Sequence, residues 1–153
     1  MNPGMFSSKT DDWATPQALF DELDAVYHFT LDVCASHANA KCAKYFTREE
    51  DGLAQDWSGE VCWMNPPYGK FVKKWVEKAS NADAIVVGLL PSRTGPRWFQ
   101  NHVFGQAEIT FLPGRLKFGA GTKAAPFDSV VAVWGKCNRT ALCQNVVPPQ
   151  IAA

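Results

Sequence analysis

A continuous apolar run is the feature of this 153-residue chain that most limits its fold. Residues 84–90 read Ala-Ile-Val-Val-Gly-Leu-Leu and stop at Pro91. The run is far shorter than a membrane span. An uninterrupted apolar run of this length is typical of a strand that is buried on both faces of a parallel sheet. The run therefore favours an α/β fold, in which helices cover both faces of a sheet.

The segments around this run alternate between strand-like and helix-like patterns. Thr15 is predicted to be the N-cap of the first helix, with Pro16 at the first helical position. Residues 38–44 are ambiguous, and a short helix is one interpretation. The pattern predicts a three-layer α/β fold with a mostly parallel sheet that ends in an antiparallel strand pair. Besides the apolar run, we expect strands over residues 29–34, 61–64, 108–111 and 130–134, and helices over residues 17–28, 71–78 and 97–104.

The length fits one domain over residues 1–153, with loose tails over 1–8 and 145–153. The first residues lack the apolar core of a signal peptide, and no run is long enough to enter a membrane. The five cysteines are odd in number and contain no Cys-x-x-Cys pair, and the three histidines share no ligand spacing. We therefore expect reduced thiols, no metal site and a cytoplasmic location.

The tetrapeptide Asn65-Pro66-Pro67-Tyr68 follows the strand predicted over residues 61–64. At ordinary residue frequencies it should arise by chance in roughly one chain of this length in two thousand. The prolines have no N–H, so the Asn65 side-chain oxygen and the Pro66 carbonyl remain as acceptors that suit a planar NH₂ group. Tyr68 offers a flat face to a base held outside its helix. The alternative, a turn with a polyproline step, explains the prolines but neither Asn65 nor Tyr68.

This tetrapeptide resembles the catalytic motif of the amino-group methyltransferases that use S-adenosylmethionine. Over residues 11–135 the chain resembles the phage-type DNA adenine-N6 methyltransferases. The resemblance implies a reduced Rossmann-like methyltransferase fold. It also implies transfer of a methyl group from S-adenosylmethionine to the N6 amino group of adenine in double-stranded DNA, with the base flipped out. The segments that carry it are, in order, DDWATPQALFDEL, FTLDVCAS, NAKCAKYFT, DGLAQDW, WMNPPYG, LLPSRT, WF, GRLKFG and APFDSVVAVW.

The resemblance assigns roles to individual residues. The first family motif is glycine-rich, whereas here Asp32 is followed by Val-Cys-Ala-Ser, and only 32 residues separate Asp32 from Asn65. We therefore expect a reduced sheet. Asp51 and Asp56 are both candidates for the acidic residue that binds the cofactor ribose, and Asn39 is a weaker candidate. The target base would be held by Asn65, Pro66, Pro67 and Tyr68. The cofactor would be held by Trp13, Thr15, Pro16, Asp32, Cys34, Ala35, Asp51 and Leu53.

The formal net charge of zero hides a separation of charge along the chain. Residues 1–62 carry four basic and eleven acidic side chains, a net of −7, and residues 63–153 carry eleven basic and four acidic ones, a net of +7. Basic side chains in the second half suit contacts with DNA phosphates. For the lysines, a solvated helix face is the alternative. The candidate DNA-binding residues are Lys70, Lys73, Lys74, Arg93, Arg97 and Arg115.

Two other functions stay open. One is an amino-group methyltransferase that acts on protein glutamine or on RNA. The other is a catalytically degenerate module that binds cofactor or DNA, against which the intact Asn65 and Tyr68 argue. The chain has no room for a separate target-recognition domain. We therefore expect the loops at residues 92–106 and 113–127, or a second copy of the chain in a homodimer, to read the DNA sequence.

Overall fold

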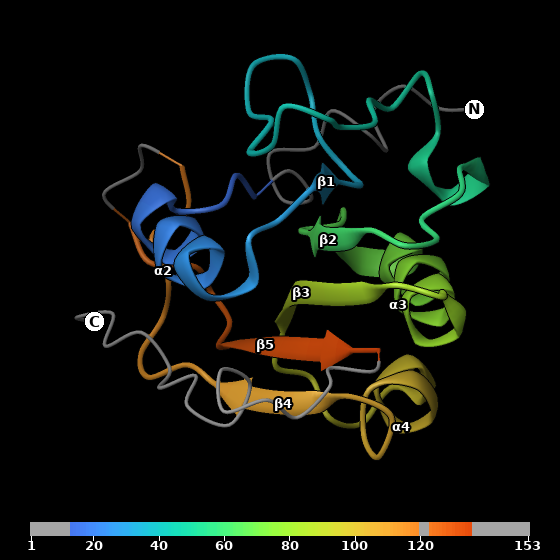
Figure 1. Ribbon diagram of the computed structural model, residues 1–153. Coiled ribbons are helices and arrows are strands. Elements are labelled where there is room, and N and C mark those ends of the chain that lie inside the picture. Colours follow the sequence, from blue (N-terminus) through green and yellow to red (C-terminus); the bar gives the residue numbers. More distant parts are fainter. Residues whose placement is uncertain (1–12, 120–122, 136–153) are drawn as a thin grey trace.

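The sheet is mixed and has the order β1-β2-β3-β5-β4 (Figure 1). The computed structural model describes residues 13–119 and 123–135. Strands β1, β2 and β3 are parallel, and β5 lies antiparallel between β3 and β4. The predicted late antiparallel pair is confirmed, and β5 is also antiparallel to β3, so β1, β2, β3 and β4 run in one direction and β5 runs in the other. The strands are β1 (Leu31–Asp32), β2 (Val61–Met64), β3 (Ile85–Pro91), β4 (Glu108–Phe111) and β5 (Ser129–Trp134).

Helices cover both faces of this sheet, so the predicted three layers are confirmed (Figure 1). Helix α2 (Gln17–Tyr27) packs on one face through a buried apolar stripe. Helices α3 (Val72–Asn81) and α4 (Arg97–His102) pack on the other face. Two short 3₁₀ helices, η1 (Gly52–Ala54) and η2 (Gly69–Phe71), lie before β2 and before α3.

The central strand β3 explains the continuous apolar run. Its residues alternate between the two faces, with Val86 and Leu90 in the core under α3 and α4, and Val87 and Leu89 in the core under α2. All four side chains are fully buried. Because both faces are covered, both sets of alternating residues must be apolar.

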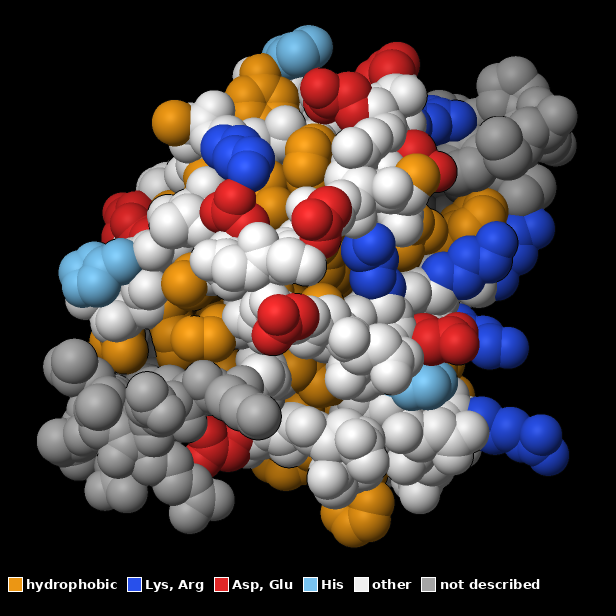
Figure 2. Space-filling view, turned by 45° about the vertical axis from the view of Figure 1, so that its right-hand side comes forward, with side chains coloured by type: hydrophobic (Ala, Val, Ile, Leu, Met, Phe, Trp, Pro, Cys, Tyr) orange, Lys and Arg blue, Asp and Glu red, His pale blue; other side chains and the backbone are white. Residues whose placement is uncertain are grey.

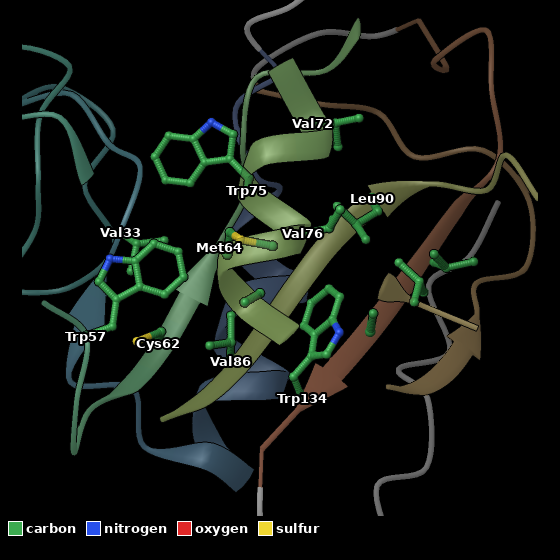
Figure 3. Packing of buried hydrophobic residues seen from close by; sticks show 14 of the residues in the cluster. Val33, Trp57, Cys62, Met64, Val72, Trp75, Val76, Val86, Leu90 and Trp134 are labelled. Carbon is green, nitrogen blue, oxygen red and sulfur yellow. The ribbon is translucent and has the colours of Figure 1, made fainter. Parts of the chain in front are cut away.

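Tryptophans fill the core under α3 and α4. Figure 3 shows Trp57 and Trp75 on one side of this core and Trp134 on the other, with Met64 and Val76 between them. The Trp134 indole N–H donates to the His102 carbonyl at 2.6 Å. A Cβ at Gly88 would lie 3.0 Å from atoms of both Met64 and Trp134, so only glycine lets these side chains approach β3 so closely.

The start of α2 differs from the prediction by one residue. The N-cap is Pro16, whose ψ of 128° is not helical and whose carbonyl accepts from the Phe20 N–H at 3.2 Å. Thr15 therefore caps no helix, and its hydroxyl oxygen accepts a hydrogen bond from the Asn65 side chain instead.

The helix interpretation of residues 38–44 is wrong. This segment forms turns and bends and then runs beside β1, where the Asp32 N–H donates to the Lys44 carbonyl and the Phe46 N–H donates to the Asp32 carbonyl. The strand predicted over residues 29–34 is shorter than expected, and helix α4 ends at His102 instead of at residue 104.

Several predictions fall outside the described residues, namely the tails at 1–8 and 145–153 and the thiols of Cys137 and Cys143. Within residues 13–119 and 123–135, no helix is long and apolar enough to cross a membrane. The same residues contain no cluster of three or more metal-ligating side chains, and Cys34, Cys42 and Cys62 form no disulfide.

Candidate active site

The candidate site lies at one edge of the sheet, where the parallel strands β1, β2 and β3 all end. Asp32 pairs with Trp63, and Met64 pairs with Gly88, so β1 and β2 end side by side while β3 continues to Pro91. Asn65 directly follows β2 at this edge, which we call the carboxyl-terminal edge. In open α/β sheets, ligands bind outside the carboxyl ends of the strands.

The Asn65 amide is held by three groups. Its Nδ2 donates to the Trp13 carbonyl at 2.5 Å and to the Thr15 hydroxyl oxygen at 2.9 Å. Its Oδ1 lies 3.2 Å from the Tyr68 hydroxyl, which also lies 3.0 Å from the Leu89 carbonyl. The structure therefore brings together four of the predicted residues, Trp13, Thr15, Asn65 and Tyr68.

Tyr68 is enclosed by aromatic side chains. Its ring is only 4% exposed and meets the edges of Phe118 and Phe127 at centroid distances of 6.4 and 5.5 Å. Trp13 packs edge-on against both phenylalanines, each at 5.3 Å. We call Trp13, Phe118 and Phe127 the aromatic cover. In this structure, the Tyr68 ring that was predicted to meet a base is buried against Phe118 and Phe127.

Phe118 and Phe127 were not among the site residues predicted from the sequence. Both lie in segments that carry the family resemblance, GRLKFG and APFDS, and aromatic residues in a glycine-containing loop are the signal that was available. Burial also raises the pKa of Tyr68 above its usual value. The phenol therefore stays protonated at neutral pH and acts as a hydrogen-bond donor.

Asp32 is a buried carboxylate at the end of β1, 3% exposed. Its two oxygens accept from the Cys34 N–H at 3.3 Å and the Lys41 N–H at 3.0 Å. Burial raises the pKa of Asp32 to about 6, and the two backbone hydrogen bonds oppose that rise. Asp32 thus ties the turn after β1, with the partly exposed Cys34 and Ala35, to residue 41.

The turn at residues 51–53 lies against the end of β1. Asp51 has a left-handed backbone with φ of 54°, and its carboxylate accepts from the Leu53 N–H at 3.2 Å. A Cβ on Gly52 would lie 2.1 Å from the Val33 carbonyl oxygen. The Lys78 ammonium on α3 donates to the Leu53 carbonyl at 3.0 Å. These contacts bring the exposed Asp51 close to the carboxyl-terminal edge.

Asp56 and Asn39, the other two candidates to bind the cofactor ribose, lie in surroundings that differ from those of Asp51. Asp56 is exposed and accepts from the Ser58 N–H and hydroxyl at 3.0 and 2.6 Å. The chain then passes to the opposite edge, where the Gly59 N–H donates to the Asp83 carbonyl just before β3 begins. Asn39 uses its side-chain oxygen to accept from the Ser36 N–H at 2.7 Å, which closes the turn after Ala35.

The predicted DNA-binding side chains are all exposed. Lys70 lies in η2 directly after the motif, Lys73 and Lys74 lie at the start of α3, and Arg93 and Arg97 follow β3. In Figure 2 many of the visible Lys and Arg side chains line the right-hand margin of the molecule. The last candidate, Arg115, lies 3.5 Å from the Asp128 carboxylate in an exposed ion pair, which contributes little to stability.

The sequence matches the family model described as DNA N-6-adenine-methyltransferase (Dam) over residues 4–137. The DNA N-6-adenine-methyltransferase of Haemophilus phage HP1 (strain HP1c1) is 34% identical over 110 residues, which cover 69% of this chain and 64% of the relative. The protein of the same name from Escherichia phage T1 is 32% identical over 111 residues, which cover 69% of this chain and 46% of the relative. The match thus spans less than two thirds of either relative. Because the family model covers most of the chain, the chain belongs to the DNA N-6-adenine-methyltransferase (Dam) family.

Proposed function

We propose that this protein transfers a methyl group from S-adenosylmethionine to the N6 amino group of adenine in double-stranded DNA, with the base turned out of the helix. The observation that carries the proposal is the orientation of the Asn65 side-chain amide. Both of its N–H groups face acceptors of the protein, so its remaining hydrogen-bonding group is the acceptor Oδ1. An acceptor at the end of a central strand suits an amino group as substrate. The names of the phage relatives support the same substrate.

The carboxyl-terminal edge has groups that suit the cofactor. The exposed Asp51 carboxylate is a good partner for ribose hydroxyls, and it is closer to the end of β1 than Asp56 is. Ala35 is small, and Asp32 holds the turn that contains it. Trp13, Pro16 and Leu53 would complete the cofactor site, as the family resemblance implies. When bound, S-adenosylmethionine supplies a methyl group on a positively charged sulfur.

Asn65 and the motif would prepare the adenine amino group for attack. Oδ1 of Asn65 accepts one amino hydrogen and the Pro66 carbonyl accepts the other, which concentrates the N6 lone pair on nitrogen. The N6–carbon bond forms as the sulfur–carbon bond breaks, and one N6 proton then leaves to water. In the structure, the Tyr68 hydroxyl lies within hydrogen-bond distance of both Asn65 Oδ1 and the Leu89 carbonyl. When the adenine amino group binds to Asn65 Oδ1, the Tyr68 hydroxyl would still donate to the Leu89 carbonyl.

The exposed basic residues would bind the phosphates beside the flipped nucleotide. Among them, Lys70 follows the end of β2 most closely in sequence, and Arg93 follows the end of β3 most closely. The loops at residues 92–106 and 113–127, or a second copy of the chain, would then read the target sequence.

Unmethylated genomic DNA is the substrate that tests the proposal, because it contains every short target sequence. We expect label from S-adenosylmethionine to enter this DNA and to be recovered as N6-methyladenine after digestion. RNA and glutamine-containing peptides serve as competing substrates. The variant Asn65→Ala should lose at least about 100-fold in rate. Label in protein or RNA but not in DNA would overturn the proposal, and an unchanged rate in Asn65→Ala would exclude the motif as the site.

A further inference from the structure

The segment that precedes α2 holds the Asn65 side chain. We propose that Thr15 is a positioning residue of the reaction: its hydroxyl, together with the Trp13 carbonyl, orients the Asn65 amide so that Oδ1 accepts the amino group of the target base. This inference rests on the proposed function, because it assigns Asn65 the role of acceptor. It differs from the cofactor contact that the family resemblance implies for Thr15.

The partners of the amide determine its orientation. A carbonyl oxygen can only accept, so the amide atom 2.5 Å from the Trp13 carbonyl must be the NH₂ nitrogen. The second N–H of this nitrogen meets the Thr15 hydroxyl oxygen at 2.9 Å. The amide oxygen consequently faces the other way, toward the Tyr68 hydroxyl at 3.2 Å.

Thr15 is itself rigidly held. It is 6% exposed, and it is followed by Pro16, whose carbonyl begins helix α2. On its other side, the Ala14 carbonyl accepts from the Gly119 N–H at 2.8 Å. Helix α2 is anchored in the core through the buried side chains of Leu19 and Leu23. The hydroxyl therefore occupies one place relative to β2, although it lies 50 residues from Asn65 in the chain.

A rotated amide would present NH₂ to the amino group of adenine, and two donors do not form a hydrogen bond. The two hydrogen bonds from Nδ2 also polarise the amide and make Oδ1 a stronger acceptor. Loss of the Thr15 hydroxyl leaves one N–H of a part-buried amide without its partner and frees the side chain to turn. We therefore expect the catalytic step to slow, while binding of DNA through phosphate contacts stays unchanged.

Three substitutions test the role. Thr15→Val keeps the shape and removes the hydroxyl, Thr15→Ala removes it without the risk of crowding, and Thr15→Ser keeps it. For the Val and Ala variants we expect kcat to fall about 10- to 100-fold, with KM for S-adenosylmethionine and for DNA changed less than about 2-fold. For Thr15→Ser we expect kcat within about 3-fold of the unsubstituted protein. Thr110→Val, on the far edge strand β4, is the control and should change neither constant.

An unchanged kcat in both hydroxyl-free variants would overturn the inference, and so would a kcat in Thr15→Ser as low as in Thr15→Val. A rise in KM for S-adenosylmethionine with kcat intact would assign Thr15 to the cofactor instead. Asn65→Ala, assayed in parallel, separates this inference from the proposed function. If Asn65→Ala is inactive and Thr15→Val is fully active, only the positioning role fails. If Asn65→Ala is fully active, the proposed role of Asn65 fails together with the positioning role of Thr15.

Discussion

The ring of Phe127 packs edge-on against the ring of Tyr68, with centroids 5.5 Å apart and planes at 74°. Edge-on aromatic pairs contribute about 0.5–1.5 kcal/mol beyond the burial of their surfaces. Tyr68 makes a second such contact with Phe118. A base that stacks on Tyr68 must therefore displace part of the aromatic cover, and the free energy of base binding includes that cost.

The hydroxyl and the ring of Tyr68 should contribute differently to stability and to methylation. Tyr68→Phe keeps the ring contacts and leaves the Leu89 carbonyl without its donor, so we expect a loss of about 1–3 kcal/mol in stability and a methylation rate within about 10-fold. Tyr68→Ala should cost about 3–5 kcal/mol and abolish methylation. Denaturant unfolding and initial rates measure both effects.

A control is needed because the alanine variant is unstable as well as inactive. Phe99→Ala opens a similar cavity on the opposite face of the sheet, where Phe99 is 2% exposed. It should be destabilised to a similar degree yet retain methylation at temperatures where it is folded. Equal loss of activity in Tyr68→Phe and Tyr68→Ala would show that the hydroxyl, and not the ring, is required.

Asp32 should make stability depend on pH. Its pKa in the folded protein is about 6, raised by burial from the ordinary 3.8. A carboxyl whose pKa is raised on folding stabilises the protein fully below the ordinary pKa, and this contribution is lost as the pH rises through the folded value. The difference corresponds to about 3 kcal/mol.

The measurement is the free energy of unfolding of the unsubstituted protein and of Asp32→Asn between pH 4 and pH 7.5. The difference between the two proteins should shift in favour of Asp32→Asn by about 3 kcal/mol as the pH rises. Asp83→Asn, which changes an exposed carboxyl, is the control variant. A difference that stays constant with pH would contradict the prediction.

Two glycines provide a matched pair that tests how the turn at residues 51–53 packs against the end of β1. A Cβ on Gly52 would lie 2.1 Å from the Val33 carbonyl oxygen, whereas one on Gly95 would meet no atom within 4 Å. We expect Gly52→Ala to lower stability by about 3 kcal/mol or more, since backbone must move. Gly95→Ala should change stability by less than about 1 kcal/mol. Thermal unfolding distinguishes them, and equal melting temperatures would show that the turn at residues 51–53 is not packed against β1.

If the exposed lysines and arginines bind phosphates as proposed, DNA binding should depend steeply on salt. Replacing Lys73 and Lys74 by Gln should weaken affinity and reduce the slope of log K against log salt by about 0.9 for each phosphate that is no longer neutralised. Fluorescence anisotropy of a labelled duplex between about 50 and 200 mM salt measures the slope. Lys44→Gln is the control, because Lys44 pairs with Glu60 in the acidic half of the chain. A slope that stays unchanged in the double variant would exclude α3 from the DNA interface.

Local patterns predicted the parts of the fold that depend on local interactions. The apolar run at residues 84–90 became β3, and the segments at 61–64 and 108–111 became strands with those bounds. The helix interpretation of residues 38–44 was wrong, because Asn39 and Ala40 form a turn on Ser36 and the Lys44 carbonyl pairs with the Asp32 N–H of β1. The apolar pattern of the segment does not indicate that it will turn back and pair with the strand that precedes it.

The candidate site shows the same division. The amino-acid sequence alone predicts that Asn65, two prolines and Tyr68 follow a buried strand, that acidic and basic residues separate along the chain, and which family the chain resembles. Only folding packs Phe118 and Phe127 against Tyr68 and places Asp51 beside the end of β1. Folding also defines which side of the Asn65 amide is the acceptor. The physical reason is that an amide can turn either way on its own. Its orientation comes from the Trp13 carbonyl and the Thr15 hydroxyl, which only folding brings to it.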